Sequence, residues 1–562
     1  MQPEELSAEN DSKSSIFMRS LLELLRVAAL LFVALVSMNV LSRLRGRPET
    51  FYSASSIHVA LLEHYPVLAM YAIAAGILLL WYFRLQLRWA DVGLEPYRFF
   101  AVVLAMALAW NYALMDCNHY FGQWHLADRC LLVLLSVAVW FSPFALIPYL
   151  SSLALFQGQF NYPAEGLIPH FWQEKALPMR LLVLFGSCAM LSVGTKYRKW
   201  PVLLLILTFV ACHYWPSAWS KVEMEWIRHN DLSLVVLSAH ANGWRQDLSF
   251  EELAQVSNQL AGSSGLAAVS TQVVELAVVM LVLPSVSFRR KRSGSYLPYF
   301  TVAILLALAQ LHLGIVVFSG VFFLNWLITD IALALLVLTF ARSKDEQIRF
   351  SATQFIAFLL LVISGSWWIE QTRFSWFETR LCYSYRFEAE FEDGGRQVLP
   401  AEVFSPHDFA FTWTVMDFLY PGKQLAVSYG NAADEETMNL VNSARSFEEI
   451  FSLEQSHGIV LYSEERVEAM KGFLARFFSN RNKNLEEPSW LDSIQRPCEI
   501  ISHPKTGDGP RSVAIARIRA IRVTTFFDGS TFDEVRREDL FVVDIPAETQ
   551  DLESKTSTSE SK

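Results

Sequence analysis

Long apolar segments fill the first two thirds of the chain. Each is about 17–25 residues long, the length at which a helix crosses the hydrocarbon core of a bilayer. Ten segments have this pattern, at about 19–42, 63–83, 98–115, 126–142, 179–196, 199–217, 264–284, 296–320, 325–342 and 351–369. Because unpaired backbone groups are not tolerated in hydrocarbon, these segments should be helices packed side by side. The pattern predicts an all-α polytopic membrane bundle of about 10–11 helices.

The eleventh candidate segment, residues 143–158, is apolar but short for a crossing helix. It contains Pro143 and Pro148. Proline inside a helix removes a backbone hydrogen bond and kinks or ends the helix. The pattern therefore leaves two interpretations open, a short crossing helix and a re-entrant piece.

After residue 370 the pattern changes from long apolar runs to alternation of apolar and polar residues. Residues 381–395 and 512–535 alternate in this way and contain DGG or DGS turns, which are strand and hairpin signals. Residues 448–455 and 463–481 have helical spacing instead. A soluble α+β domain is therefore expected at the C-terminal end of the chain.

This organisation divides the chain into four parts. They are a polar N-terminal segment at 1–18, a transmembrane helical domain at 19–369, the α+β domain at 370–548 and a tail at 549–562. The tail lacks apolar anchors and is expected to be disordered.

Composition and charge exclude some classes of function. Hydrophobic residues make up 53% of the chain and charged residues 18%, below the roughly 25% of soluble domains. The net charge is -10 and no sustained basic block occurs, which argues against a nucleic-acid partner. None of the six cysteines forms a C-x-x-C pair, so no zinc motif is present. Cys382 and Cys498, in the polar third, are candidates for a disulfide if they face an oxidising compartment.

Positively charged loops indicate how the helices are oriented. They lie at 84–88, 196–199, 289–292 and 342–349. Because cytoplasmic loops are enriched in Lys and Arg, counting 143–158 as a crossing puts all four loops and the N-terminus inside. His119, Lys221 and the C-terminal domain are then extracytoplasmic. One basic loop, 42–47, would lie on the outer side and does not fit this orientation.

The first cluster of candidate residues is MDCNHYFGQWHL, residues 115–126, between two predicted helices. It brings together Asn118, His119, Tyr120 and His125. Ionisable groups at a membrane edge are costly and are functional candidates, although a belt of interfacial aromatic and polar residues has the same composition. Two histidines six residues apart do not form a helical ligand pair, so no metal site is predicted.

The second cluster is SAWSKVEMEWIRHN, residues 217–230. In a continuous helix Lys221 and Glu225 would be i,i+4 neighbours, and Trp226 would lie beside them. One interpretation is a membrane-edge anchor, in which the lysine pairs with the carboxylate. The other is a buried neutral amine that acts as a base. Taken alone, the residues favour the anchor.

The third candidate is Glu275, which lies near the middle of an apolar segment. A carboxylate at such a position needs a partner or a water pocket. Gln310 and His312, in another predicted helix, are the candidate partners. An interhelical hydrogen bond with a structural role explains the residue equally well.

Together these elements resemble the vitamin K-dependent gamma-carboxylase family and its bacterial relatives, the horizontally transferred transmembrane (HTTM) proteins. CNHYF (Asn118, His119, Tyr120) is similar to the family's Asn-Asn-His-x-Tyr-Leu-like element. AWSKVEMEWI is similar to its Gly-x-x-Lys-Leu-x-x-Asp-Trp element, with Lys221 on the lysine and Trp226 on the tryptophan.

Two further elements extend the resemblance to about residues 15–340. Glu275 and Arg289 are similar to the family's acidic residue and following arginine, and AQLHLGIVVFSGVFF is similar to its histidine-containing helix. The sequence departs from the family at Cys117, in place of an asparagine, and at Ala218, in place of a glycine. His312 is also out of register with the family's histidine in that helix.

The resemblance implies a site, a cofactor and a reaction. In the family a membrane lysine deprotonates a reduced quinone, oxygen converts the quinone to a strong base, and this base removes a proton from a peptidyl glutamate that then takes up CO2. Lys221 would be the base, and His119 and Asn118 would steady the quinone oxygen. The remaining residues assigned to the quinone site are Tyr120, Trp226, His312 and Glu275, of which Glu275 would be either structural or part of the site. The family's lumenal β-rich domain is compatible with the strands predicted after residue 380.

A second hypothesis comes from a different class of function. The size of the C-terminal domain and the departures from the family motifs also fit a non-enzymatic membrane scaffold or receptor. In that case the chain contacts membrane lipid through its helices and binds a partner protein through its outer C-terminal domain.

Overall fold

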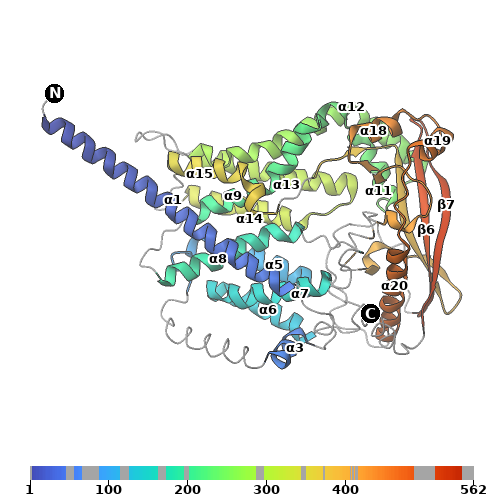
Figure 1. Cartoon of the computed structure of the whole chain (residues 1–562), viewed down its shortest axis with the longest axis horizontal. Helices are drawn as coiled ribbons and strands as arrows, with labels where there is room; N and C mark the ends of the chain where they lie inside the picture. The colour runs from blue at the N-terminus through green and yellow to red at the C-terminus, as the bar shows by residue number, and fades with distance from the viewer. Residues whose placement is uncertain are drawn as a thin grey trace, which may run out of the picture.

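The computed structural model describes most of the chain. The described residues are 3–45, 56–65, 88–113, 126–161, 167, 173–194, 201–285, 297–342, 350–370, 374–404, 407, 411, 416–485 and 513–546. They form a mostly helical structure with a β-sheet region near the C-terminal end. The sheet lies at one end of the helical bundle, and the N-terminus of α1 lies at the opposite end (Figure 1).

Fourteen α-helices occur among the described residues before residue 370. They are α1 (Pro3–Arg45), α3 (Ile57–His64), α5 (Arg98–Ala113), α6 (Leu126–Phe141), α7 (Leu146–Asn161), α8 (Gln173–Gly194), α9 (Val202–Glu223), α10 (Trp226–His229), α11 (Val235–Ala241), α12 (Phe250–Leu276), α13 (Leu297–Ser319), α14 (Leu324–Arg342), α15 (Ala352–Ile363) and α16 (Gly365–Trp368). The polar segment predicted at 1–18 is therefore part of α1 from Pro3 onward.

Five of the described helices are long and apolar enough to cross a membrane. They are Met18–Leu44, Val202–Glu223, Phe250–Ser285, Pro298–Ser319 and Leu324–Arg342. Five of the predicted segments fall on these helices. The segments predicted at 98–115, 126–142, 179–196 and 351–369 are also helical, but their helices or apolar portions are shorter. Most of 63–83 lies outside the described residues, as does the tail at 549–562.

The segment at 143–158 is helical, and its two prolines lie at the start of the helical region, where they do not interrupt it. Ser142 caps a short 3₁₀ turn, Pro143–Ala145, that leads directly into α7. Pro148 lies in the first turn of α7, where backbone N–H groups have no partner within the helix. Proline is therefore tolerated there.

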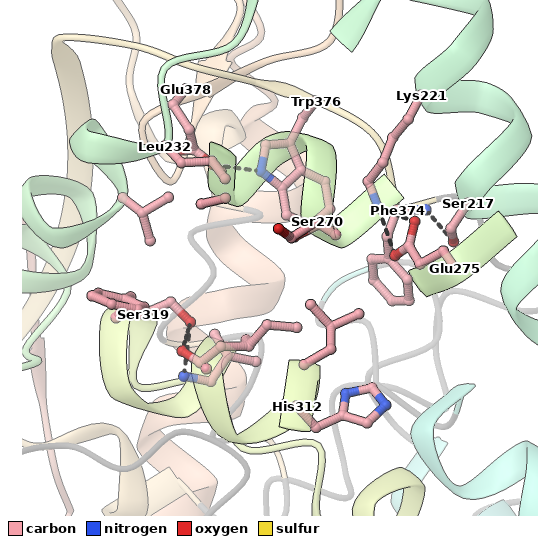
Figure 2. A pocket seen from close by; sticks show the side chains of 18 of the residues that line it. Ser217, Lys221, Leu232, Ser270, Glu275, His312, Ser319, Phe374, Trp376 and Glu378 are labelled. Atoms are coloured by element: carbon pink, nitrogen blue, oxygen red, sulfur yellow. Dashed lines mark hydrogen bonds and ion pairs between the residues drawn. The ribbon is translucent and has the colours of Figure 1, made fainter. Parts of the chain in front are cut away.

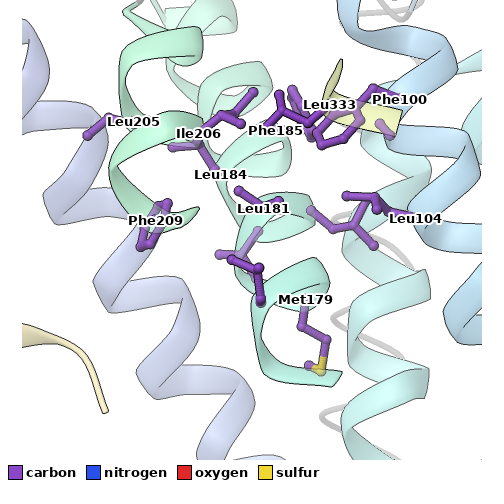
Figure 3. Close-up of a cluster of buried hydrophobic side chains, with 14 of the residues drawn as sticks. Phe100, Leu104, Met179, Leu181, Leu184, Phe185, Leu205, Ile206, Phe209 and Leu333 are labelled. Atoms are coloured by element: carbon purple, nitrogen blue, oxygen red, sulfur yellow. The ribbon is translucent and has the colours of Figure 1, made fainter. Parts of the chain in front are cut away.

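Helix α9 forms the centre of the bundle. In its most apolar stretch 89% of the residues are buried, as expected for a helix that is hydrophobic on all sides. Leu205, Ile206 and Phe209 of α9 belong to the same buried cluster as Phe185 of α8 and Phe100 of α5 (Figure 3). The same helix carries Lys221 in its last turn.

The C-terminal region contains two antiparallel sheets. The larger has the order β3-β2-β6-β7, with β2 at Leu381–Phe391, β3 at Arg396–Val398, β6 at Ile515–Phe527 and β7 at Phe532–Asp544. The smaller has the order β1-β5-β4, with β1 at Phe377–Glu378, β4 at Val427–Ser428 and β5 at Asn431–Ala432. The accompanying helices are α18 (Glu435–Ser443), α19 (Phe447–His457) and α20 (Glu464–Asn484). The strands and helices predicted from alternation and helical spacing are confirmed.

Hydrogen bonds fasten this region to the helical bundle. Trp226 Nε1, in α10, donates to the backbone oxygen of Trp376 at 2.8 Å. The backbone N–H of Glu378 donates to Asn230 Oδ1 at 2.6 Å. Gly430, in the turn between β4 and β5, lies against Ser238 of α11. The small sheet and the ends of the helices therefore form one packed unit.

Gly430 should be sensitive to substitution at this contact. Its φ is +73°, and an alanine Cβ would lie 2.7 Å from Ser238 Cβ. Gly430→Ala should therefore combine backbone strain of about 1–3 kcal/mol with overpacking of a further ~1–3 kcal/mol. Thermal unfolding of the full chain in detergent measures the loss.

The matched control is Gly394→Ala. Gly394 has a similar φ of +81° but no atom within 4 Å of the added Cβ, so its loss should be limited to backbone strain. Ser238→Gly in the Gly430→Ala background should recover part of the stability. Equal losses at the two glycines would show that the contact does not constrain the fold.

Candidate functional site

A cavity of about 400 Å³ lies where the helical bundle meets the small sheet. Helices α9, α12, α13 and α14 form its walls, and β1 and β5 contribute to its lining (Figure 2). Its volume is within the roughly 300–1,000 Å³ of ligand sites, which are mostly apolar with a few polar groups. Its aromatic lining residues are His213, Tyr214, Trp226, Phe318, Phe323, Trp326, Phe374, Trp376 and Tyr429, together with His312.

Lys221 and Glu275 form a buried ion pair on the wall of this cavity. Lys221 Nζ donates to both carboxylate oxygens of Glu275 at 2.7 Å, across the gap between α9 and α12. Nζ also lies 5.3 Å from the centroid of the Trp226 ring, within the range of a cation–π contact. Both charged side chains are more than nine-tenths buried. The structure therefore brings together three of the predicted site residues.

Two predicted pairings are wrong. Helix α9 ends at Glu223, and Glu225 has a left-handed φ of 49°, so Lys221 and Glu225 do not share a continuous helix. The Glu225 side chain is largely exposed and pairs with Arg228 at 3.3 Å. Glu275 likewise pairs with Lys221 and not with Gln310 or His312, because Gln310 is exposed and His312 has its own partner.

A row of three polar side chains lies at another part of the cavity. His312 Nε2 is 2.7 Å from the hydroxyl of Tyr214, and this hydroxyl donates to Asp330 Oδ2 at 2.7 Å. His312, Tyr214 and Asp330 come from α13, α9 and α14, and Asp330 is fully buried. His312 and Tyr214 line the cavity, whereas Asp330 lies behind them.

The C-terminal region contributes a third polar group, Glu378. Trp376 Nε1 donates to Glu378 Oε1 at 2.8 Å, and the Asn431 amide, with its nitrogen toward the carboxyl group, donates to Oε2 at 2.6 Å. The pKa of Glu378 is raised to about 8, mainly by burial; the Trp376 hydrogen bond lowers this pKa and the nearby charge of Asp231 raises it. The cavity therefore has a carboxyl group on the side of the small sheet that is mostly protonated at neutral pH.

The predicted residues of the 115–126 cluster cannot be placed. Asn118, His119 and Tyr120 lie outside the described residues, and their roles stay predictions. Trp226 and His312 line the cavity together with Lys221 and Glu275.

Sequence reasoning missed Tyr214, Asp330 and Glu378. Asp330 carries the same signal as Glu275, an acidic residue inside an apolar segment, in LNWLITDIALA. Glu378 carries no such signal, because a glutamate near a short strand is unremarkable in a polar region.

A separate polar cluster joins α3, α6 and α7. His58 Nδ1 lies 2.5 Å from Asp128 Oδ1, and His58 Nε2 lies 3.0 Å from Ser152 Oγ. Asp128 also accepts from Ser56 Oγ and from the backbone N–H of Ile57 at the start of α3. Ser152 is only 2% exposed. These bonds cap α3 and fasten it to the bundle, which accounts for the cluster structurally.

Comparisons with known proteins give no family or function. No protein-family model, curated protein or solved structure matches the chain. Among the described residues, no group of three histidine, cysteine or acidic side chains is arranged to hold a metal ion.

The raised pKa of Glu378 predicts a pH dependence of stability. In the folded chain this carboxyl group keeps its proton up to about pH 8, whereas an unfolded glutamate loses it near the ordinary value of 4.5. The folded state binds more protons between these values, so stability should fall as pH rises from about 5 to about 8. Urea unfolding of the full chain at a series of pH values measures this slope.

Glu378→Gln should flatten that slope. An amide imitates the protonated carboxyl group in size and in its lack of charge, and its oxygen can accept from Trp376 Nε1 as Oε1 does. The variant should therefore be more stable than the unsubstituted chain above pH 8 and similar below pH 5. Glu436→Gln, at an exposed position, should leave the slope unchanged. An unaltered slope in Glu378→Gln would contradict a buried, protonated carboxyl group.

Proposed function

We propose that the chain is a multi-pass membrane enzyme similar to the vitamin K-dependent gamma-carboxylases and HTTM proteins. It binds a reduced quinone in the cavity and removes a proton from it with Lys221. The observation that carries the proposal is the Lys221–Glu275 pair, which is buried on the wall of a mostly apolar cavity. Buried ion pairs are costly, and ionisable groups in apolar segments are functional candidates.

The pair provides a simple route for the proton. Lys221 first gives an Nζ proton to Oε1 of Glu275, over the 2.7 Å that separates them, and the neutral amine that results takes the proton of a ligand hydroxyl at Nζ. The ligand O–H bond breaks, the carboxylate becomes a carboxylic acid, and the lysine remains an ammonium group. The negative ligand oxygen then lies beside a positive charge in a site of low polarity, where this attraction is strong.

The membrane-length helices support the same ligand class. Five described helices have the length and composition of membrane-crossing helices, and a quinone dissolves in the bilayer between them. In this proposal the C-terminal domain is extracytoplasmic, as the positively charged loops indicate. The cavity is then at the outer end of the helices. His119 and Asn118 remain the proposed donors to the quinone oxygen.

The proposal is tested by binding and turnover in the full chain, reconstituted in lipid nanodiscs. Trp226, Trp326 and Trp376 line the cavity, so a reduced 1,4-naphthoquinone should quench tryptophan fluorescence. With oxygen, labelled bicarbonate and a glutamate-containing peptide, the protein should then incorporate label. Lys221→Met should lower incorporation by about 10²–10⁴-fold, the usual contribution of a general base.

Lys423→Met is the matched control, because Lys423 is an exposed lysine of the C-terminal region, and it should keep full incorporation. Quenching without incorporation would favour the alternative, a non-enzymatic scaffold or receptor that holds a quinone or lipid. The absence of both quenching and incorporation would refute the proposed binding site. Equal incorporation by the unsubstituted chain and Lys221→Met would end the role of Lys221 as base.

A further inference from the structure

Two buried nitrogens near the His312 row lack hydrogen-bond partners. They are Nδ1 of His312 and Nε1 of Trp326. Both residues line the cavity, and they are 2% and 3% exposed. Their rings lie 5.5 Å apart, centroid to centroid. Buried polar groups are almost always paired, so two unpaired nitrogens on one cavity wall call for a ligand.

The hydrogen bonds of the row fix the chemical character of His312 Nδ1. The Tyr214 hydroxyl gives its hydrogen to Asp330, so its oxygen accepts from Nε2–H of His312. In the neutral imidazole the other nitrogen, Nδ1, then has no hydrogen and acts as an acceptor. The indole nitrogen of Trp326 can only donate.

An acceptor beside a donor matches a hydroxyl group, which gives one hydrogen and accepts another. A ketone oxygen would leave Nδ1 unpaired, and an ammonium group would leave the indole N–H unpaired. Figure 2 shows the His312 ring at the cavity, below the Lys221–Glu275 pair in that view. The cavity therefore has two separate places for a hydroxyl group, one at each set of polar side chains.

Asp330 enables His312 to accept a proton as well as a hydrogen bond. Its Oδ2 lies 3.5 Å from His312 Nε2, and its side chain is fully buried. A proton that moves from a ligand oxygen to Nδ1 breaks the O–H bond, forms an N–H bond and leaves a positive imidazolium. The carboxylate stabilises this charge, as in other Asp–His pairs.

We propose that His312 and Trp326 bind the second hydroxyl of an aromatic para-diol, with His312 as its proton acceptor and Tyr214 and Asp330 as positioning residues. This inference rests on the proposed function, in which the first hydroxyl lies at Lys221. Among reduced quinones, it selects those whose two hydroxyl groups lie at opposite ends of the ring system. A monophenol fills only one of the two places.

The row also links three helices, and a purely structural role would explain its two hydrogen bonds. It would not explain why the outer nitrogen of His312 and the neighbouring indole N–H are both left unpaired on the cavity wall. Trp326 is instead held by stacking on Phe323, at 4.5 Å between centroids. The aromatic packing orients the donor without using its N–H group.

The test compares two ligands under anaerobic conditions in the full chain in nanodiscs. They are 1,4-dihydroxynaphthalene and its monomethyl ether, 4-methoxy-1-naphthol, and tryptophan quenching gives both affinities. The unsubstituted chain should prefer the diol by about tenfold, the effect of one well-made hydrogen bond. Asp330→Asn and Tyr214→Phe should reduce this preference to about threefold or less. The ether, whose hydroxyl lies at Lys221, should bind as before.

The preference distinguishes positioning from general damage, because a distorted cavity weakens both ligands alike. Thr329→Val is the matched control. Thr329 is a buried neighbour of Asp330 on α14. Its hydroxyl donates to the backbone oxygen of Asn325 at 2.6 Å, and the preference should survive there. Binding of neither ligand by the unsubstituted chain refutes the proposed function itself. Equal binding of the two ligands, or a preference that persists in Asp330→Asn, overturns this inference while the proposed function stands.

Discussion

The site depends on one constraint, that a charge placed among packed apolar helices must be paired. Lys221 and Glu275 meet this constraint with two hydrogen bonds of 2.7 Å between α9 and α12. Removal of one partner would leave a buried charge, which typically costs about 3–5 kcal/mol. The pair therefore joins two walls of the cavity, α9 and α12.

The cavity is a joint product of the helical bundle and the C-terminal region. The helices supply Lys221, Glu275 and the His312 row, whereas the small sheet supplies Glu378. The bonds from Trp226 and Asn230 to the β1 segment hold the two parts together. The C-terminal region therefore forms part of the cavity wall and helps to set the shape of the site.

The general architecture was predictable because its signals are local. Apolar runs specify buried helices, and alternation specifies the strands β2 and β6 and the hairpin turn that leads into β7. Lys221 and Glu275 stood out for the same reason, since ionisable residues in or beside apolar segments are rare. Their pairing was not predictable. A break after Glu223 turns Glu225 away, and the actual partner lies 54 residues further along the chain. Only the tertiary packing of α9 against α12 determines which carboxylate pairs with Lys221.

The most direct test of the central claim is naphthohydroquinone binding by the double variant Lys221→Met/Glu275→Leu. Replacing both members of a buried ion pair with apolar residues is often neutral for stability, so this variant should fold and unfold near the temperature of the unsubstituted chain. The account predicts that it nevertheless fails to bind the ligand. Unchanged affinity in the folded double variant would show that the pair is structural and would contradict the account.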